Sequence, residues 1–378
     1  MDASAMRGVT RHNLARFPRR QVLQAMGASA FCAQALPRQL LAQTATSFRP
    51  GPYRTLEELS ASLLASGVSA DEAKILLPLA KPAIALQSTA ADDTMIALGA
   101  SKIGGSPDVP RDFVWPVRQP TTFGLSVVEI LRGYAADSAE EDLKSQIALK
   151  EQLAKRVAPL AFMAQIDLAA CATAGPCDAD MPRTGHFLLF YDLVFNPERG
   201  READGNRLFQ LIHVEGDLTR QASPDLGFPL FGGLEAYRNC LPSAQFKPIF
   251  TYTLPDQRAA PITPSYLNRP YPHENWSDSQ PTHLDASNRL GGWPENIRRE
   301  MTIALSAEDA RINIASLKYR EIFKLLGEAA QDWVMLLQIG AYDNDINDFN
   351  GLYYIWIQRR HLRARDFSQA RLIYQKDG

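Results

Sequence analysis

A seven-residue pattern near the middle of the chain returns near its end. Residues 101–107 read Ser-Lys-Ile-Gly-Gly-Ser-Pro, and residues 288–294 read Asn-Arg-Leu-Gly-Gly-Trp-Pro. Two further matches follow in the same order, Gln165-Ile166 with Gln338-Ile339 and residues 185–190 with residues 351–356. Three matches in one order predict an internal duplication. Duplicated halves often pack about a pseudo-twofold axis, with a cleft where they meet.

Short runs rich in apolar and aromatic residues predict strands in both halves. They cover residues 162–166, 186–193, 208–214, 246–254, 334–339 and 352–358. Their continuous apolar character indicates strands that are covered on both faces. The expected fold is therefore α+β, with a strand-dominated core of two duplicated halves at about 101–192 and 288–358.

Helix-start signals precede and interrupt these halves. Thr55 and Ser69 each stand three residues before a glutamate, which is the capping-box pattern. They predict a helical N-terminal appendage over residues 46–95. Similar signals at Ser138 and Ser306 predict helices inserted within a main domain that spans residues 96–378.

The first 45 residues have the pattern of an export signal. Arg19 and Arg20 precede a short, mildly apolar stretch over residues 22–36, and Arg38 follows it. This is typical of a twin-arginine signal peptide, which predicts export by the Tat translocase to the periplasm. An amphipathic helix or a disordered tail is the alternative. The stretch is shorter than the roughly 20 residues that span a bilayer, so no stable membrane insertion is expected.

The charge of the chain argues against nucleic acid as a partner. Residues 1–42 hold six arginines and one aspartate, so their removal lowers the formal net charge from −2 to −7. An acidic protein does not track phosphates well. The expected partner is instead an unknown protein or a small acidic ligand.

Two cysteines lie close together in the first half. Cys171 and Cys177 are separated by five residues that include Gly175 and Pro176. A disulfide across this loop and a pair of free thiols both fit the pattern. Zinc is not expected, because the sequence offers no second pair of ligands at a suitable spacing.

The ordered motifs resemble the YwqG-like family, a bacterial domain of unknown function. The resemblance runs through residues 102–108, Trp115-Pro116, 162–168, 185–192, 290–294, 336–339, 352–357 and 365–367. Gly340 departs from the family pattern, which has an acidic residue there, and the insertion at about 121–158 is unusually long. The resemblance implies the fold and, through relatives found beside toxin systems, an immunity-like role. It supplies no catalytic residues.

The residues beside the glycine pairs are the candidate ligand site. If the halves pack symmetrically, Lys102 and Arg289 flank one cleft, and Trp115 and Trp293 form its aromatic walls. Such a cleft suits an acidic or carboxylate-bearing partner. The alternative makes the glycine pairs ordinary turns, both tryptophans core residues and both cations surface residues.

No catalytic motif accompanies these residues. The chain lacks a G-x-S-x-G elbow, a P-loop, a dinucleotide-binding glycine pattern and H-E-x-x-H. The sequence therefore favours a non-catalytic binding or protein-interaction module with no cofactor and no metal. The alternative is a periplasmic hydrolase that uses the cleft and the loop at 272–285, which contains His273, Glu274 and His283.

Two other polar segments have simpler explanations. Residues 343–348 resemble the start of a calcium loop, but the later glycine and glutamate are missing. The arginines at positions 359, 360, 363 and 365 are expected to pair with nearby carboxylates.

Overall fold

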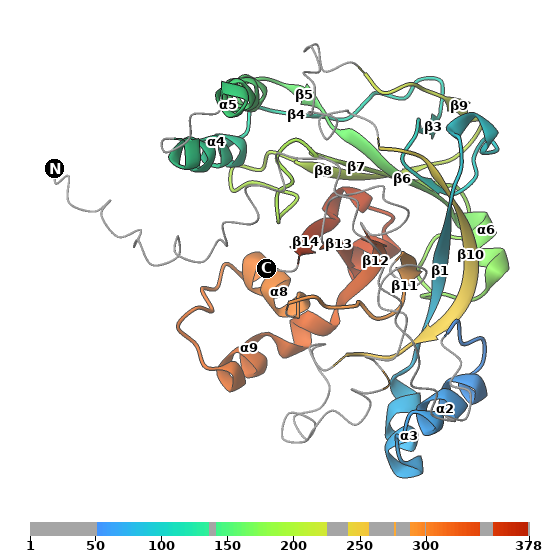
Figure 1. The fold of residues 1–378 in the computed structure, drawn as a ribbon. Coiled ribbons are helices and arrows are strands. Elements are labelled where there is room, and N and C mark those ends of the chain that lie inside the picture. Colours follow the sequence, from blue (N-terminus) through green and yellow to red (C-terminus); the bar gives the residue numbers. More distant parts are fainter. Residues whose placement is uncertain are drawn as a thin grey trace, which may run out of the picture. The chain divides into compact units, whose positions relative to one another are not determined.

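The structure is a computed structural model, and it has an α+β fold. It describes residues 51–135, 141–224, 241–256, 276, 288–298, 300–340 and 351–376. The main element is one ten-stranded antiparallel sheet that curves into a nearly closed barrel (Figure 1). The export motif Arg19-Arg20 lies outside the described residues.

The order of the strands in this sheet places the two halves on either side of a central pair. The strands are β14 (Arg371–Lys376), β13 (Gly351–Gln358), β12 (Trp333–Gly340), β11 (Arg289–Gly291), β1 (Lys81–Ala90), β10 (Ala244–Thr253), β2 (Lys102–Ile103), β6 (Ala161–Asp167), β7 (His186–Tyr191) and β8 (Phe209–Val214). The central strands β1 and β10 pair along all ten of their residues. The second-half strands follow β1, and the first-half strands follow β10.

The two outermost strands approach each other through a short segment before β8. Gly200 N donates to Leu372 O at 3.2 Å, and Tyr374 N donates to Glu198 O at 3.0 Å. Inside the barrel, the ring of Tyr353 lies 5.2 Å from that of Tyr191 and 4.5 Å from that of Tyr374. Residues 198–200 therefore bridge part of the gap between β8 and β14.

All six strands predicted from the sequence are confirmed as β6, β7, β8, β10, β12 and β13. The predicted helical appendage is correct only in its first part. Residues 81–90 form β1 in the centre of the sheet rather than a helix. Pro82 is tolerated there because the pairing of β1 with β11 covers only residues 83–85, so the N–H that proline lacks would have no partner in β11 at position 82.

Several helices begin where nearby side chains accept hydrogen bonds from their first N–H groups. The described α-helices are α2 (Leu56–Ala65), α3 (Ala70–Leu76), α4 (Thr122–Ala135), α5 (Glu141–Ala154), α6 (Leu168–Ala174), α8 (Thr302–Ala310), α9 (Tyr319–Gln331) and α10 (Arg359–Arg363). Thr55 and Ser69 cap α2 and α3 as predicted. The start predicted at Ser306 is wrong, because Glu300 accepts from Ile303 N at 2.8 Å and α8 begins before Ser306. None of the described helices is long and apolar enough to cross a membrane.

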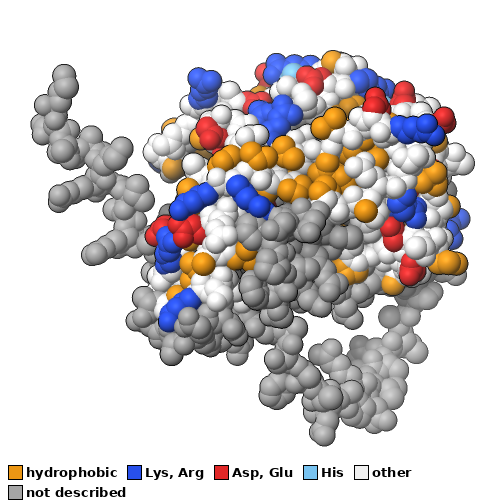
Figure 2. Space-filling model, turned by 90° about the horizontal axis from the view of Figure 1, so that it is seen from above, with side chains coloured by type: hydrophobic (Ala, Val, Ile, Leu, Met, Phe, Trp, Pro, Cys, Tyr) orange, Lys and Arg blue, Asp and Glu red, His pale blue; other side chains and the backbone are white. Residues whose placement is uncertain are grey.

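Short elements connect these strands and helices. They are the 3-10 helices η1 (Leu77–Leu79), η2 (Asp93–Met95) and η6 (Phe367–Gln369), and the paired strands β3 (Asp108–Val109) with β9 (Thr219–Arg220) and β4 (Val117–Arg118) with β5 (Ala158–Pro159). Apolar side chains gather on the face above β4 and β5 (Figure 2). Val114, Val117 and Val157 are among the exposed apolar residues there.

The same strand pairing occurs beside both glycine pairs. Lys102 of β2 pairs with Gln165 of β6, and Arg289 of β11 pairs with Gln338 of β12. In both β6 and β12 the register shifts shortly before the glutamine. The glutamine is buried in each case.

Side-chain hydrogen bonds repeat at the same aligned positions. Gln165 Oε1 accepts from Asp108 N at 2.8 Å, and Gln338 Oε1 accepts from Glu295 N at 2.9 Å. In the same way, Ser101 Oγ accepts from Asp167 N, and Asn288 Oδ1 accepts from Gly340 N, both at 2.8 Å. Since all four acceptors lie in the predicted repeats, the repeats share a hydrogen-bond pattern as well as a sequence pattern.

The glycine pairs have the same backbone conformation. The φ angles are +65° and +68° at Gly104 and Gly105, and +70° and +77° at Gly291 and Gly292. This left-handed region favours glycine. A Cβ at position 104 would lie 2.0 Å from Pro242 O, so this glycine is also required by the close approach of another chain segment.

Candidate functional site

The structure does not bring the four residues of the predicted cleft together. Lys102 is completely buried, and its Nζ lies 2.9 Å from Asp93 Oδ1 and 3.8 Å from Asp108 Oδ2. Trp115 packs on Phe190 at 5.2 Å between ring centres and donates from Nε1 to Leu160 O at 2.9 Å. Both residues therefore support the first half, since a buried ammonium needs carboxylates and a buried indole N–H needs an acceptor.

Arg289 is also largely engaged by its own turn. Its side chain is only 12% exposed, and its guanidinium donates to Trp293 O at 3.2 Å and to Glu295 Oε2 at 3.3 Å. Burial lowers the pKa of Arg289, and the charge of Glu295 opposes that shift. This arginine is placed to fix the turn. Trp293, in contrast, lines a cavity.

That cavity lies on the outer face of the second half and has a volume of about 440 Å³. The turn at Gly291-Gly292 forms one side, and β12, β13 and the start of α8 form the others. We call it the tryptophan pocket, after Trp293, Trp333 and Trp356, which line it. Its size is within the range of small-molecule sites.

A glycine is needed where the turn meets the neighbouring strands. A Cβ on Gly292 would lie 2.7 Å from both Ala83 Cβ and Thr253 Oγ1. Thr253 Oγ1 also accepts from Trp293 N at 2.9 Å. The close approach of the turn to β1 and β10 therefore fixes the position of Trp293.

The three tryptophans differ in how their indole N–H groups are satisfied. Trp293 Nε1 donates to Leu79 O at 2.7 Å, and Trp333 Nε1 donates to Ser306 Oγ at 3.1 Å. Trp356 is 4% exposed, and its buried Nε1 has no acceptor within the described parts of the chain. A buried donor without a partner costs about 1–3 kcal/mol, so this N–H is a candidate contact for a ligand.

Lys81 brings a positive charge to the pocket. Although the residue as a whole is exposed, its Nζ lies 3.6 Å from the centre of the Trp293 ring. Burial of this end of the side chain lowers the pKa of Lys81 to about 8, with Asp178 opposing the shift and Arg359 adding to it. In the described structure no carboxylate oxygen lies within 4.0 Å of this ammonium. Among the described residues, Lys81 therefore contacts an aromatic ring but no carboxylate.

The other charged residues of the pocket are engaged. Arg359 contacts Asp178 at 2.9 Å and Asp180 at 2.7 Å, and these carboxylates raise the pKa of the arginine. Arg363 also contacts Asp180, at 3.1 Å. The predicted pairing with local carboxylates is thus confirmed for these two arginines. Burial raises the pKa of Glu300, which caps α8.

The two cysteines are free thiols. Cys177 Sγ donates to Leu290 O at 3.5 Å, next to the glycine turn. Burial raises the pKa of Cys171 to about 12 and that of Cys177 to about 11, so neither is an activated nucleophile.

The loops with further candidate residues lie outside the described residues. This holds for 343–348 and, apart from Trp276, for 272–285. Trp276 donates from Nε1 to Ser62 Oγ at 3.0 Å and packs with Tyr53. Within the described ranges, no three histidine, cysteine or acidic side chains are placed to hold a metal ion.

Sequence reasoning missed Lys81 and Trp356. Lys81 reaches Trp293 only through pairing between strands far apart in the chain, and no local signal marks it. Trp356 had a signal, because its aligned position in the first half is Phe190, which carries no polar atom. A tryptophan in a fully buried strand introduces an N–H that needs an acceptor.

Comparisons with known proteins establish a family but no activity. No curated protein matches the chain. The model of the family described as "Domain of unknown function (DUF1963)" matches residues 101–375, which cover both glycine turns and strands β2 to β13. The match extends over most of the chain, and we conclude that this protein belongs to the DUF1963 family.

Proposed function

We propose that this domain is a non-catalytic binding module whose tryptophan pocket takes a small planar ligand with an acidic group. The observation that carries the proposal is the buried indole N–H of Trp356, which lacks an acceptor among the described residues of a pocket that also holds the Lys81 ammonium. Both groups are donors. A ligand that supplies acceptor oxygens would satisfy them.

The shape and charge of the pocket support this ligand class. Trp293 and Trp333 offer flat apolar surfaces on which a planar ring can pack. Of the two cations among the described lining residues, Arg359 is already neutralised by Asp178 and Asp180, which leaves Lys81 to attract an anion. Because the pKa of Lys81 is about 8, binding should be strongest below that pH and weaken as the pH rises through it.

Calorimetric titration with indole-3-acetate, and with indole as the uncharged analogue, tests the proposal. We expect indole-3-acetate to bind more tightly than indole. Lys81→Met and Trp356→Phe should each weaken its binding about tenfold, the equivalent of one hydrogen bond to a charged group. Trp356→Phe should change the free energy of unfolding by no more than about 1 kcal/mol, because lost ring volume and the removed N–H have opposite effects.

Trp115→Phe is the matched control, since Trp115 is a partly buried tryptophan outside the pocket. It should leave the affinity unchanged. Equal weakening by Trp115→Phe, or wild-type affinity in both pocket variants, would contradict the proposed site.

We also propose that the two halves arose by duplication and that the chain is a YwqG-like protein, as its motifs suggest. The matching hydrogen bonds of Gln165 and Gln338 support a common origin. Comparing the loss of stability on replacing each of these two glutamines tests whether the halves are equivalent.

Export through the twin-arginine pathway is likewise a proposal. It rests on Arg19 and Arg20 and on the short stretch that follows them. Replacing both arginines by lysine should leave the protein in the cytoplasm, as fractionation of expressing cells would detect. Undiminished export of that variant would reject it.

A further inference from the structure

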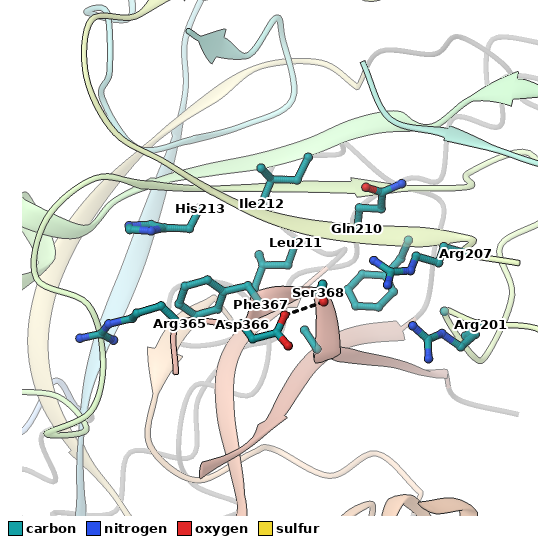
Figure 3. Close-up of a pocket in the computed structure, with 13 residues that line it drawn as sticks. Arg201, Arg207, Gln210, Leu211, Ile212, His213, Arg365, Asp366, Phe367 and Ser368 are labelled. Atoms are coloured by element: carbon teal, nitrogen blue, oxygen red, sulfur yellow. Dashed lines mark hydrogen bonds between the residues drawn. The ribbon is translucent and has the colours of Figure 1, made fainter. Parts of the chain in front are cut away.

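A second cavity lies where the two edge strands of the sheet approach each other (Figure 3). It has a volume of about 330 Å³ and is lined by β8, by the hairpin that precedes β8 and by η6. None of its described lining residues also lines the tryptophan pocket. We call it the arginine cavity, after Arg201 and Arg207.

These two arginines lie side by side. They face each other across an antiparallel bridge, where two like charges normally destabilise the pairing. Figure 3 shows both side chains at the same end of the cavity. Burial lowers the pKa of Arg201, and the charges of Arg371 and Arg207 lower it further.

Nearby acidic groups leave this positive charge largely unbalanced. Across the described residues, no carboxylate oxygen lies within 4.0 Å of either Arg201 or Arg207. Asp309 partly offsets the charge, but it is engaged by Arg371 at 3.5 Å and by Gln358 at 2.7 Å. Two half-buried cations therefore share one end of a cavity without a direct counter-ion from the part of the chain that the structure describes.

Most of the remaining lining residues are apolar or already hydrogen-bonded. Phe209, Leu211 and Phe367 are buried and give it an apolar wall. Asp366, the only carboxylate among the described lining residues, accepts from Ser368 Oγ at 2.5 Å. At the far end His213 contacts Thr184 O at 3.0 Å, and Arg365 donates to Asp180 O.

We propose that the arginine cavity binds a small organic anion, whose phosphate or carboxylate group contacts Arg201 and Arg207 and whose apolar body packs on Phe209 and Leu211. The planar guanidinium group forms paired hydrogen bonds with the oxygens of either anion. A bound anion would also remove the repulsion between the two arginines. The cavity volume fits a ligand of about one ring and one head group.

Titration calorimetry at low salt with phenyl phosphate, inorganic phosphate and benzoate tests the proposal. Phenyl phosphate should bind more tightly than inorganic phosphate, because it adds contact with the apolar wall. Benzoate distinguishes the two head groups. If benzoate binds more weakly than phenyl phosphate, the site is a phosphate site. If benzoate binds as tightly or more tightly, the site is a carboxylate site. Arg201→Gln and Arg207→Gln should each weaken the better aryl ligand at least tenfold.

Arg183→Gln is the control, since Arg183 is exposed and lies outside the cavity. It should leave the affinities unchanged. If the wild-type protein binds none of the three probes at millimolar concentration, or if the two cavity variants bind as the wild type does, the proposal is overturned.

Thermal unfolding without ligand gives a second, independent measurement. Removing one of two opposed like charges should raise the melting temperature of Arg207→Gln by about 1–2 °C at low salt, and high salt should abolish the rise. A lower melting temperature would mean that Arg207 is already paired in the folded chain, and that result would also overturn the proposal.

Discussion

Phe190 and Trp356 occupy matching positions in β7 and β13, but their surroundings differ. Phe190 is covered by Phe113, at 5.8 Å between ring centres, and by Trp115, at 5.2 Å. Trp356 lines an open pocket and carries an N–H without an acceptor in the described structure. The same arrangement of strands is thus filled by the chain's own aromatic side chains in one half and lines a pocket in the other.

The charged residues beside the glycine pairs show the same contrast. Lys102 is sealed between Asp93 and Asp108, and Arg220 also binds Asp108 at 2.8 Å. Among the described residues, Arg289 has a single carboxylate partner, Glu295, which is 37% exposed. The first turn is therefore stabilised by a buried ionic network, whereas the second is held by fewer contacts next to the pocket.

The largest expected effect comes from removing the buried cation. Lys102→Met leaves the buried Asp108 and its neighbour Asp93 with less positive charge, and should lower the free energy of unfolding by about 3–5 kcal/mol. Arg289→Met should cost only about 1.5 kcal/mol, because fewer and more exposed groups lose a partner. Urea denaturation measures both.

Lys74→Met is the control for the loss of a lysine ion pair, since Lys74 and its partner Asp71 are largely exposed. It should cost less than about 0.5 kcal/mol. Equal costs for Lys102→Met and Arg289→Met would show that the two turns do not differ in this way.

Replacing either of the two buried glutamines should lower the free energy of unfolding by a smaller amount, and the two amounts should be nearly equal. Gln165→Leu and Gln338→Leu each remove the acceptor for one backbone N–H and should each cost about 1–3 kcal/mol. Chemical denaturation of the two variants under identical conditions checks this. Costs that differ by more than about 2 kcal/mol would argue against equivalent halves.

A pH-dependent effect on stability is expected from Lys81. Burial lowers the pKa of Lys81 from the usual 10.5 of a lysine to about 8, so between these values the unfolded chain binds the proton more strongly than the folded chain. Stability from this group should therefore rise with pH between about 8 and 10.5. The difference in the free energy of unfolding between wild type and Lys81→Met, measured at each pH, isolates the contribution of Lys81. Lys150, whose pKa is also lowered to about 8, titrates in both proteins and cancels. If the difference in stability between the two proteins stays the same from about pH 8 to pH 10.5, the buried position of the Lys81 ammonium is contradicted.

The sequence predicted those features that depend on neighbouring residues. The paired glycines identified two turns of equal conformation, and apolar runs identified six strands, because both signals are local. It missed β1, whose Pro82 and preceding helix signals masked a strand. It also placed Lys102 and Arg289 in a cleft, because a basic residue beside a turn does not reveal the carboxylate with which it is buried. The tryptophan pocket depends on contacts such as Trp293 with Leu79, 214 residues apart, which local patterns cannot indicate.

The unit that folds is longer than the region of sequence similarity, because it includes β1 at the centre of the sheet. The family match begins at residue 101, but Lys81–Ala90 lies between β11 and β10 and pairs with both. Without this strand the sheet would divide into a group of four strands and a group of five. A chain cut at the family boundary would therefore keep every shared motif and lose the strand that joins its two halves.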